Sequence, residues 1–417
     1  MYQKGKHWFF AKLDDFDTSN WSGRLRIKKN GAVRLSLLIG SNDFKTLHTL
    51  FEKRQILNGY LEHQGPVCLL QPFFMSFGIN TYKIHAQCLL EGVHLTRADE
   101  ACFTGFSLES EALHAILNPK VIKVHYETSA NKLTPQKIDF LPNQHTAFAT
   151  KNGTEVSVYS GASMSWRAYD VPKIKSGSLL EIKFSEPLNC NDAKNYVEKV
   201  HFFFCFLAGK QLEVGRHEFF TNKRKENNGG VEFITAKSIY KSSLRDCPLR
   251  MGNQKSFINL TETKVSLEQI FEQISADEDH ALSYLMDMIL QSERNKGELS
   301  DRFTELVGLL ENFHKMNFGP KDGMSLFQRL EQLADDWKQD GFHAYPDLRK
   351  IKEFRNFKPH GRGVDFSHDD MQHIAHVLPF LSALTRYHIL KKLGFDRKEI
   401  AQSFMTFARL YGRFIPK

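Results

Sequence analysis

The spacing of hydrophobic residues changes once along this chain, and that change limits its fold more than any other feature. Up to about residue 240, apolar and polar residues alternate in short runs separated by glycine and proline, which is the pattern of half-buried β-strands. From about residue 265 the apolar residues recur every three or four positions, as in amphipathic helices. We therefore predict an α+β chain in which a β-rich domain at residues 1–255 precedes an all-helical domain at residues 256–417.

The β-rich domain is expected to form an antiparallel sheet that is sandwich-like or barrel-like. Basic and apolar residues alternate at 24–28, and Asn30-Gly31 offers a hairpin turn before a second alternating run at 33–37. Further strand-like runs lie at residues 82–95, 120–126, 154–159, 179–184, 211–220 and 231–240.

Three segments of this domain depart from the strand pattern. A helix is predicted after residue 190, with Asn191 as its cap and Gly209 at its end. A polar loop is expected at 223–230. Residues 241–264 are polar and basic without either period, so the domain boundary is placed in this segment.

The helical domain is expected to be a bundle. A capping box pairs a Ser or Asp with a Gln or Glu three residues later, and each side chain bonds the other residue's backbone N–H. Such boxes are predicted at Ser266, Ser275, Ser325 and Asp396. The main helices are predicted at residues 276–292, 299–316, 325–339, 347–357, 369–393 and 397–411.

The composition is that of a folded globular protein, with 41% hydrophobic and 25% charged residues. No apolar segment follows the basic residues at the start of the sequence, and the most apolar run, 200–208, is too short to span a bilayer. We therefore expect a cytoplasmic protein with no membrane partner. The six cysteines lie far apart and are expected to be buried thiols, and no spacing predicts a metal site.

The formal net charge of +8 is compatible with a polyanionic partner such as nucleic acid. The cations are dense around one segment near the C-terminus, where Lys352, Lys358 and Arg362 are candidates for binding an RNA backbone. A second cationic cluster begins at Arg386 and extends to residue 398. The alternative for both clusters is a solvated helix face, which is the commoner origin of a charge run.

The segment Arg355-Asn356-Phe357-Lys358-Pro359-His360-Gly361 lies in the first cationic cluster. An arginine carries a permanent charge and a fork of donors that matches phosphate oxygens, and a histidine exchanges a proton near neutral pH. Pro359 disfavours helical geometry at the residue before it, so Arg355 should lie on the last turn of a helix and His360 just after it. If both side chains reach one phosphate, they predict cleavage of a phosphodiester. The alternative is an arginine that caps its own helix and a histidine on a solvated loop.

This motif and the helical pattern around it resemble HEPN domains, small helical ribonucleases in which an arginine and a polar residue precede a histidine. The resemblance covers about residues 262–417. The first domain resembles the N-terminal domain of ApeA-type anti-phage defence proteins, in which such a domain precedes a HEPN nuclease. The segments that carry the second resemblance are Trp21-Ser22-Gly23-Arg24-Leu25-Arg26-Ile27, Leu57-Asn58-Gly59-Tyr60-Leu61 and Cys88-Leu89-Leu90-Glu91-Gly92-Val93-His94.

The resemblance implies an endoribonuclease that acts in abortive infection on transfer RNA or other host RNA, as a homodimer or a higher homo-oligomer. It also implies that the N-terminal domain restrains the nuclease or responds to a phage-derived trigger.

In the predicted reaction the ribose 2′-OH attacks the adjacent phosphate without a metal ion. Arg355 would hold the phosphate, His360 would transfer a proton, and Asn356 would bond a phosphate oxygen or orient His360. No glycine-rich loop of the kind that cradles phosphates is present in the sequence, so no cofactor is expected. The alternative function is a catalytically silent HEPN-like bundle that binds nucleic acid or a protein partner.

Overall fold

The protein is described from a computed structural model, and the chain divides into two compact units. The first unit comprises Met1–His114, Pro119–Glu198 and Leu212–Arg250, and the second comprises Ala115–Asn118, Lys199–Gln211 and Met251–Lys417. The division predicted between residues 255 and 256 stays a prediction. The structure describes residues 6–11, 21–28, 31–39, 44–62, 65–78, 81–129, 132–165, 173–215, 217–227, 230–240, 247, 255–294, 298–319, 323–342, 346–357, 368–411 and 414.

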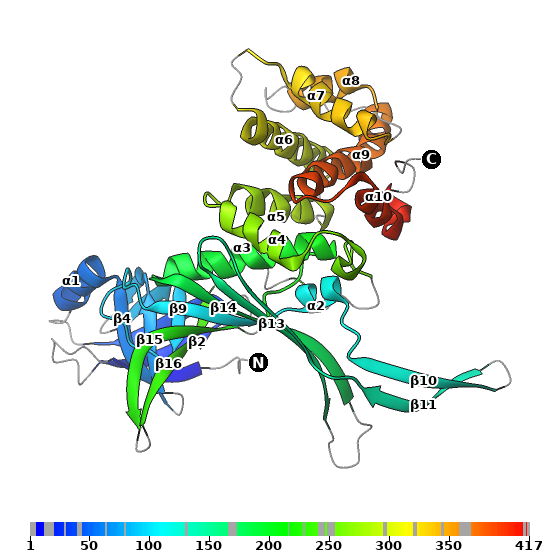
Figure 1. The fold of residues 1–417 in the computed structure, drawn as a ribbon. Coiled ribbons are helices and arrows are strands. Elements are labelled where there is room, and N and C mark those ends of the chain that lie inside the picture. The colour runs from blue at the N-terminus through cyan, green and yellow to red at the C-terminus, as the bar shows by residue number, and fades with distance from the viewer. Residues whose placement is uncertain are drawn as a thin grey trace. The chain divides into compact units, whose positions relative to one another are not determined.

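The first unit is built on antiparallel strands, and helices make up most of the described part of the second, so the predicted α+β class is confirmed (Figure 1). The described strands are β1 (Lys6–Ala11), β2 (Ser22–Ile27), β3 (Val33–Leu38), β4 (Ile56–Leu61), β5 (Gly65–Leu70), β6 (Phe73–Gly78), β7 (Thr81–Ala86), β8 (Cys88–Glu91), β9 (Phe103–Glu109), β10 (Ile122–Ser129), β11 (Lys132–Phe140), β12 (Gln144–Ala149), β13 (Glu155–Ser165), β14 (Lys173–Leu188), β15 (His217–Asn227) and β16 (Gly230–Tyr240).

The described helices include α1 (Phe44–Arg54), α2 (Glu111–Leu117), α3 (Cys190–Ala208), α4 (Leu267–Ala276), α5 (Ala281–Arg294), α6 (Leu299–Phe318), α7 (Leu326–Gln339), α8 (Leu348–Phe357), α9 (His368–Lys392), α10 (Arg397–Thr406) and α11 (Ala408–Tyr411).

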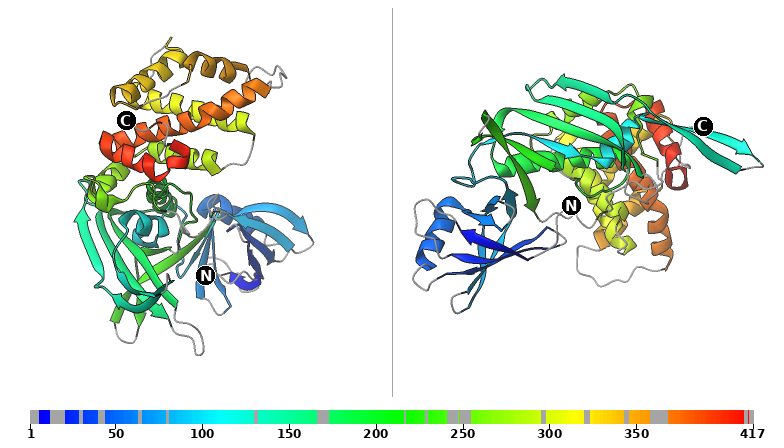
Figure 2. Two further views of the ribbon diagram at one scale, coloured as in Figure 1. Left: turned by 90° about the vertical axis from the view of Figure 1, so that its right-hand side faces the viewer. Right: turned by 90° about the horizontal axis from the view of Figure 1, so that it is seen from below.

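Most of the described strands belong to one long ladder. Its order is β12-β13-β14-β9-β15-β16-β8-β5-β4-β1-β2-β3-β7-β6, and every pairing in it is antiparallel. Strands β10 and β11 pair only with each other among the described residues. This hairpin stands clear of the large sheet in Figure 1 and in the right-hand view of Figure 2.

Strands β2 and β3 form the predicted hairpin. They pair from Ser22 opposite Leu38 to Ile27 opposite Val33, and along both strands buried side chains alternate with less buried or exposed ones. Gly31 closes the turn with a φ of 79°, which glycine adopts without the steric cost that a Cβ would impose. The alternation of apolar and basic residues therefore places one face of this hairpin in the core.

Two of the segments that carry the family resemblance contact each other. The Nδ2 of Asn58 donates a hydrogen bond to the carbonyl oxygen of Leu95 at 2.7 Å, and the Nε2 of His94 lies 2.8 Å from the carbonyl oxygen of Gly59. Gly59 leaves room for the Phe9 ring, whose atoms lie 2.4 Å from the place where a Cβ would stand. These residues therefore join the loop after β8 to β4, and β4 to β1.

Several details of the β region differ from the sequence prediction. Helices α1 and α2 were not indicated by the sequence pattern. Helix α3 is capped by Asn189, whose Oδ1 accepts a hydrogen bond from the N–H of Asp192 at 3.0 Å, and not by Asn191. Residues 223–227 continue strand β15 where a loop was expected, because ladder bonds hold polar residues in a hairpin as well as apolar ones.

The capping boxes mostly confirm the predicted helix starts. They form at Ser266, Ser325 and Asp396. The box predicted at Ser275 is wrong, because Ser275 lies in the last turn of α4. Asp277 follows α4, and its carboxylate accepts hydrogen bonds from the N–H groups of Leu282 at 2.8 Å and Ser283 at 3.0 Å in the first turn of α5. The helix predicted at 276–292 is therefore α5, which begins at Ala281, and α4 is a separate helix that begins after Ser266.

Helix α9 lies at the centre of the second unit. It packs against α5, α6, α7, α10 and α11, and every residue from Phe380 to Leu390 is buried. The apolar side chains of α9 at Ile374, Leu378, Leu381, Leu384 and Leu390 are therefore core, whereas Ala375 is exposed. None of the helices in the described part of the chain is long and apolar enough to cross a membrane.

Candidate active site

Helix α8 carries the first residues of the predicted arginine–histidine motif. Its buried face consists of Leu348, Ile351 and Phe354, which are the apolar residues that predicted the helix. The Oδ1 of Asp347 accepts a hydrogen bond from the N–H of Arg349 at 2.9 Å, so the aspartate caps the first turn. The described part of α8 runs to Phe357, and the residues that were predicted to end the helix lie outside the described part of the chain.

The exposed side of α8 carries three cations and one carboxylate, that of Glu353. Arg349, Lys350 and Lys352 are exposed, and the Arg349 guanidinium lies 5.9 Å from the centre of the Phe327 ring. Lys352 was predicted to bind RNA, and its exposure leaves it accessible to a phosphate backbone. The helix therefore anchors itself with apolar side chains and presents its cations to solvent.

Arg355 lies on the last turn of α8 and is paired with a carboxylate from α6. Its Nη2 lies 3.4 Å from the Oε2 of Glu311, and the other oxygen of Glu311 lies 3.2 Å from the Nζ of Lys315. The Arg355 side chain is 38% exposed and that of Glu311 is 20% exposed. A single long contact at a half-exposed position is worth about 0–1 kcal/mol, so Glu311 orients the guanidinium without holding it tightly.

The remaining predicted site residues cannot be placed beside Arg355. Asn356 is part of helix α8, but its side chain is not among those described. Lys358, His360 and Arg362 lie at positions 358–367, outside the described residues. The convergence of Arg355 and His360 on one phosphate therefore stays a prediction, as do the phosphate contacts of Lys358 and Arg362.

The imidazole of His373, on the second turn of α9, lies against α8, a contact that the sequence pattern did not predict. Its ring lies 5.4 Å from the Phe354 ring, and its Nε2 is buried with no hydrogen-bond partner in the described part of the structure. Burial, followed by the nearby charge of Lys350, lowers the pKa of His373. Its helical spacing from His376 was the only signal in the sequence, and it did not indicate the contact with α8.

The cysteines do not form a site. All six are buried free thiols, as predicted. Burial raises the pKa of Cys102 to about 11 and that of Cys68 still further, so neither thiol is a nucleophile near neutral pH. Among the described residues, no group of three or more His, Cys, Asp and Glu side chains is arranged to hold a metal ion.

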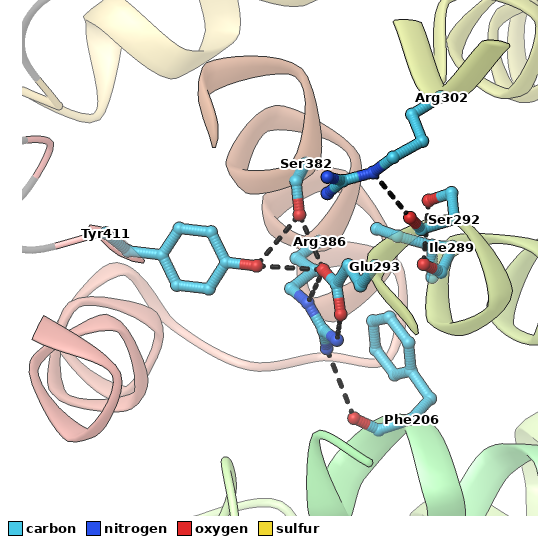
Figure 3. Close-up of polar contacts among 8 residues, drawn as sticks. All are labelled: Phe206, Ile289, Ser292, Glu293, Arg302, Ser382, Arg386 and Tyr411. Atoms are coloured by element: carbon cyan, nitrogen blue, oxygen red, sulfur yellow. Dashed lines mark hydrogen bonds and ion pairs between the residues drawn. The ribbon is translucent and has the colours of Figure 1, made fainter. Parts of the chain in front are cut away.

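A buried ion pair joins helix α9 to its neighbours (Figure 3). Glu293 accepts hydrogen bonds from Arg386, with Oε1 2.9 Å from Nε and Oε2 2.5 Å from Nη2. Ser382 and Tyr411 also donate to Oε1, at 2.5 and 2.8 Å. The Nη1 of Arg386 donates to the carbonyl oxygen of Phe206 at 3.3 Å. These bonds connect α9 to α5, α11 and the end of α3.

The prediction that Arg386 belongs to an exposed cationic cluster is wrong. Its side chain is 2% exposed, and its guanidinium lies 5.0 Å from the Phe206 ring and 4.8 Å from the Phe257 ring. Burial alone would raise the pKa of Glu293, but the charge and hydrogen bonds of Arg386 hold the pKa below its usual value. This arginine is therefore part of the core and does not face RNA.

Comparison with known proteins finds one family. Residues 4–273 match the family model described as ApeA N-terminal domain 1. The match covers the whole β region and continues into helix α4. No curated protein and no solved structure matches the chain.

Proposed function

The chain belongs to the ApeA N-terminal domain family and is an ApeA-type anti-phage defence protein, and on that premise we propose that its helical region is a metal-independent HEPN endoribonuclease. The observation that carries the proposal is the environment of Arg355. It lies at the end of an exposed cationic helix, and one weak contact with Glu311 is the only ion pair of its side chain among the described residues. A phosphate can replace that carboxylate at little cost, because a bidentate arginine–phosphate contact is stronger than a single long one.

The reaction that suits these residues is attack by the ribose 2′-OH on the adjacent phosphate. Arg355 binds the phosphate oxygens and stabilises the charge that develops on them. His360 takes or gives the proton, and Asn356 bonds a phosphate oxygen or orients the imidazole. Since the nucleophile belongs to the ribose, DNA is not a substrate.

Binding of the RNA strand is assigned to the cations around this pair. Lys352 is exposed on α8, and Lys358 and Arg362 follow in the sequence after the helix end. Each would neutralise a phosphate on either side of the cleaved bond, which makes affinity strongly dependent on salt. Transfer RNA or another host RNA is the proposed target, and cleavage of it would abort the infection.

The reaction needs an acid and a base, and one copy of the motif supplies one imidazole. A two-fold dimer that brings two copies of the motif together would supply both. We therefore include a homodimer in the proposed function. Light scattering after size exclusion would test it, and a monomer at concentrations where RNA is cleaved would contradict it.

The nuclease proposal is tested with labelled RNA in a chelator. We expect cleavage products that end in 2′,3′-cyclic phosphate, and no cleavage of DNA of the same sequence. Cleavage that requires a divalent metal ion would contradict the mechanism. Binding of the RNA without any cleavage would instead support the silent regulator.

A further inference from the structure

Strand β14 extends beyond the strand that pairs with it on one side. It pairs with β13 down to Lys173 opposite Ser165, but its pairing with β9 ends at Leu179 opposite Glu109. The chain of β9 then turns into helix α2 (Figure 1). Residues 173–178 of β14 are therefore paired on the β13 side alone among the described strands.

The backbone of this stretch has groups that point to the open side. The N–H of Ser110 donates to the carbonyl oxygen of Ser178 at 3.1 Å, so the peptide groups of Ser178 point away from β13. Alternate residues of a strand direct their peptide groups to the same side. The N–H and C=O groups of Ile174 and Ser176 therefore also point to the open side, where no described strand pairs with them.

A cavity of about 690 Å³ lies at this open side. One wall is formed by β14 together with residues 159–163 of β13, and another includes Glu213 and Gly215, which lead into β15. Because β9 lies between β14 and β15 in the ladder and residues 109–111 also line the cavity, the cavity reaches from the β13–β14 pair to the place where β9 ends. Its volume is in the range of ligand-binding pockets, about 300–1,000 Å³.

Small residues keep this space open. Gly177 lines the cavity, and no atom lies within 4 Å of the position where its Cβ would stand. His114, on α2, supports the strand, with Nε2 3.0 Å from the Oγ of Ser176 and Nδ1 3.1 Å from the Oγ of Ser178. These contacts hold β14 in place and leave the part of the cavity beside Gly177 open.

The charge of the cavity is opposite to that of the whole chain. Glu109, Glu111 and Glu213 line it, whereas Lys175 is the one basic residue among its described lining. The chain carries a formal net charge of +8, so three carboxylates in one cavity are a local reversal. Complementary charges favour a cationic partner at such a place.

We propose that this cavity binds an extended segment of a partner polypeptide, which adds a strand beside β14 and places lysine or arginine side chains against Glu109, Glu111 and Glu213. The peptide groups of Ser176, in the cavity lining, and of Ile174, two residues before it on the same edge, supply main-chain hydrogen bonds, and the carboxylates select basic side chains. The site lies within the first unit, and its binding does not depend on the proposed nuclease.

The probe is a fluorescein-labelled heptapeptide of alternating lysine and valine, and its binding to the full-length protein is measured by fluorescence anisotropy. Three competitors separate the contributions of main-chain hydrogen bonds and of charge to binding. They are the same peptide with N-methylated peptide groups, a glutamate–valine peptide, and spermidine. We expect the unmodified basic peptide to compete, and each of the three to compete at least about tenfold less well.

Two variants test the walls of the cavity. The triple variant Glu109→Gln, Glu111→Gln, Glu213→Gln keeps the shape and removes the charge, and Gly177→Trp fills open space without a clash at its Cβ. Each should weaken peptide binding at least about tenfold. The matched control neutralises three other carboxylates on β13 and β14 outside the cavity lining, namely Glu155→Gln, Glu181→Gln and Glu186→Gln, and should leave the affinity unchanged.

Failure of the basic peptide to bind would overturn the proposal. So would equal competition by the N-methylated peptide, because strand addition requires its N–H groups. Equal competition by spermidine would reduce the site to a general cation site and would also overturn it. Since the readout is peptide binding, a protein that cleaves no RNA can still confirm this site, and a protein that binds no peptide can still be a nuclease.

Discussion

Two arginines of the helical region, Arg386 and Arg355, each face one glutamate, and their surroundings differ. Arg386 is 2% exposed and meets Glu293 through two short contacts, at 2.9 and 2.5 Å. Arg355 is 38% exposed and meets Glu311 through one contact at 3.4 Å. The first glutamate has two further donors from the protein core, and the second shares its charge with the exposed Lys315.

The difference separates a structural ion pair from an exchangeable one. A buried charge that loses its partner keeps its full desolvation cost, which makes the Arg386 pair expensive to break. A half-exposed charge recovers its hydration from water, so the Arg355 pair can open and accept another anion. The same two residue types therefore hold the bundle together in one place and leave a cation available in the other.

The largest effect is expected from breaking the buried pair. Arg386→Ala leaves Glu293 uncompensated and should lower the free energy of unfolding by about 3–5 kcal/mol. Arg355→Ala should lower it by no more than about 1 kcal/mol. Denaturant unfolding monitored by circular dichroism measures both.

A double variant shows whether the loss of stability in Arg386→Ala comes from the buried charge of Glu293 that is left without a partner. The double variant Glu293→Gln, Arg386→Met should be more stable than Arg386→Ala alone, because no charge remains buried. Equal losses for Arg386→Ala and Arg355→Ala would contradict the comparison.

His388, two residues after Arg386, is also buried, and it predicts that the free energy of unfolding depends on pH. Burial lowers the pKa of His388 to about 4, and its Nε2–H donates to the carbonyl oxygen of Leu333 at 3.0 Å. The unfolded chain takes up a proton near pH 6.5 and the folded chain takes it up only near pH 4, so stability falls as pH falls between these values. The loss from this group is at most about 3 kcal/mol.

His388→Gln retains a donor for Leu333 and removes the titration. Unfolding free energies measured at several pH values from 7 to 4 should therefore change less in this variant than in the original protein. Identical pH profiles would show that His388 does not titrate as its burial requires.

The starts of the helices were easier to predict from the sequence than the difference between the two ion pairs. Ser266, Ser325 and Asp396 cap helices as predicted, because a capping box is complete within four residues. Arg386 was misassigned because its partner Glu293 lies on another helix, 93 residues away. A local pattern shows where a charge is, and it does not show whether a distant carboxylate will bury it.

The same limit applies to the β region and to the candidate site. Alternation predicted the hairpin of β2 and β3, whose turn is local, but nothing local places β8 between β5 and β16. Arg355 was found from its motif, whereas its contact with Glu311 joins residues 44 positions apart. Contacts of this range depend on how helices pack, which the sequence pattern leaves open.

The smallest effect is expected from loosening the exposed pair. Glu311→Gln removes the carboxylate that competes with phosphate for Arg355, so RNA should bind about threefold more tightly, a gain of about 0.6 kcal/mol. Filter binding in the His360→Ala background measures affinity without cleavage. Weaker RNA binding in this variant would show that Glu311 helps Arg355 to bind RNA.

The central claim is that Arg355 holds the phosphate that is cleaved, and the rate of RNA cleavage by Arg355→Ala tests it most directly. The control is Lys315→Ala, which removes the other cation paired with Glu311. In chelator, we predict that Arg355→Ala loses at least about a hundredfold in rate, as expected when a charge-stabilising group is removed, and that Lys315→Ala stays within about threefold of the original protein. Equal rates for the two variants would contradict the account.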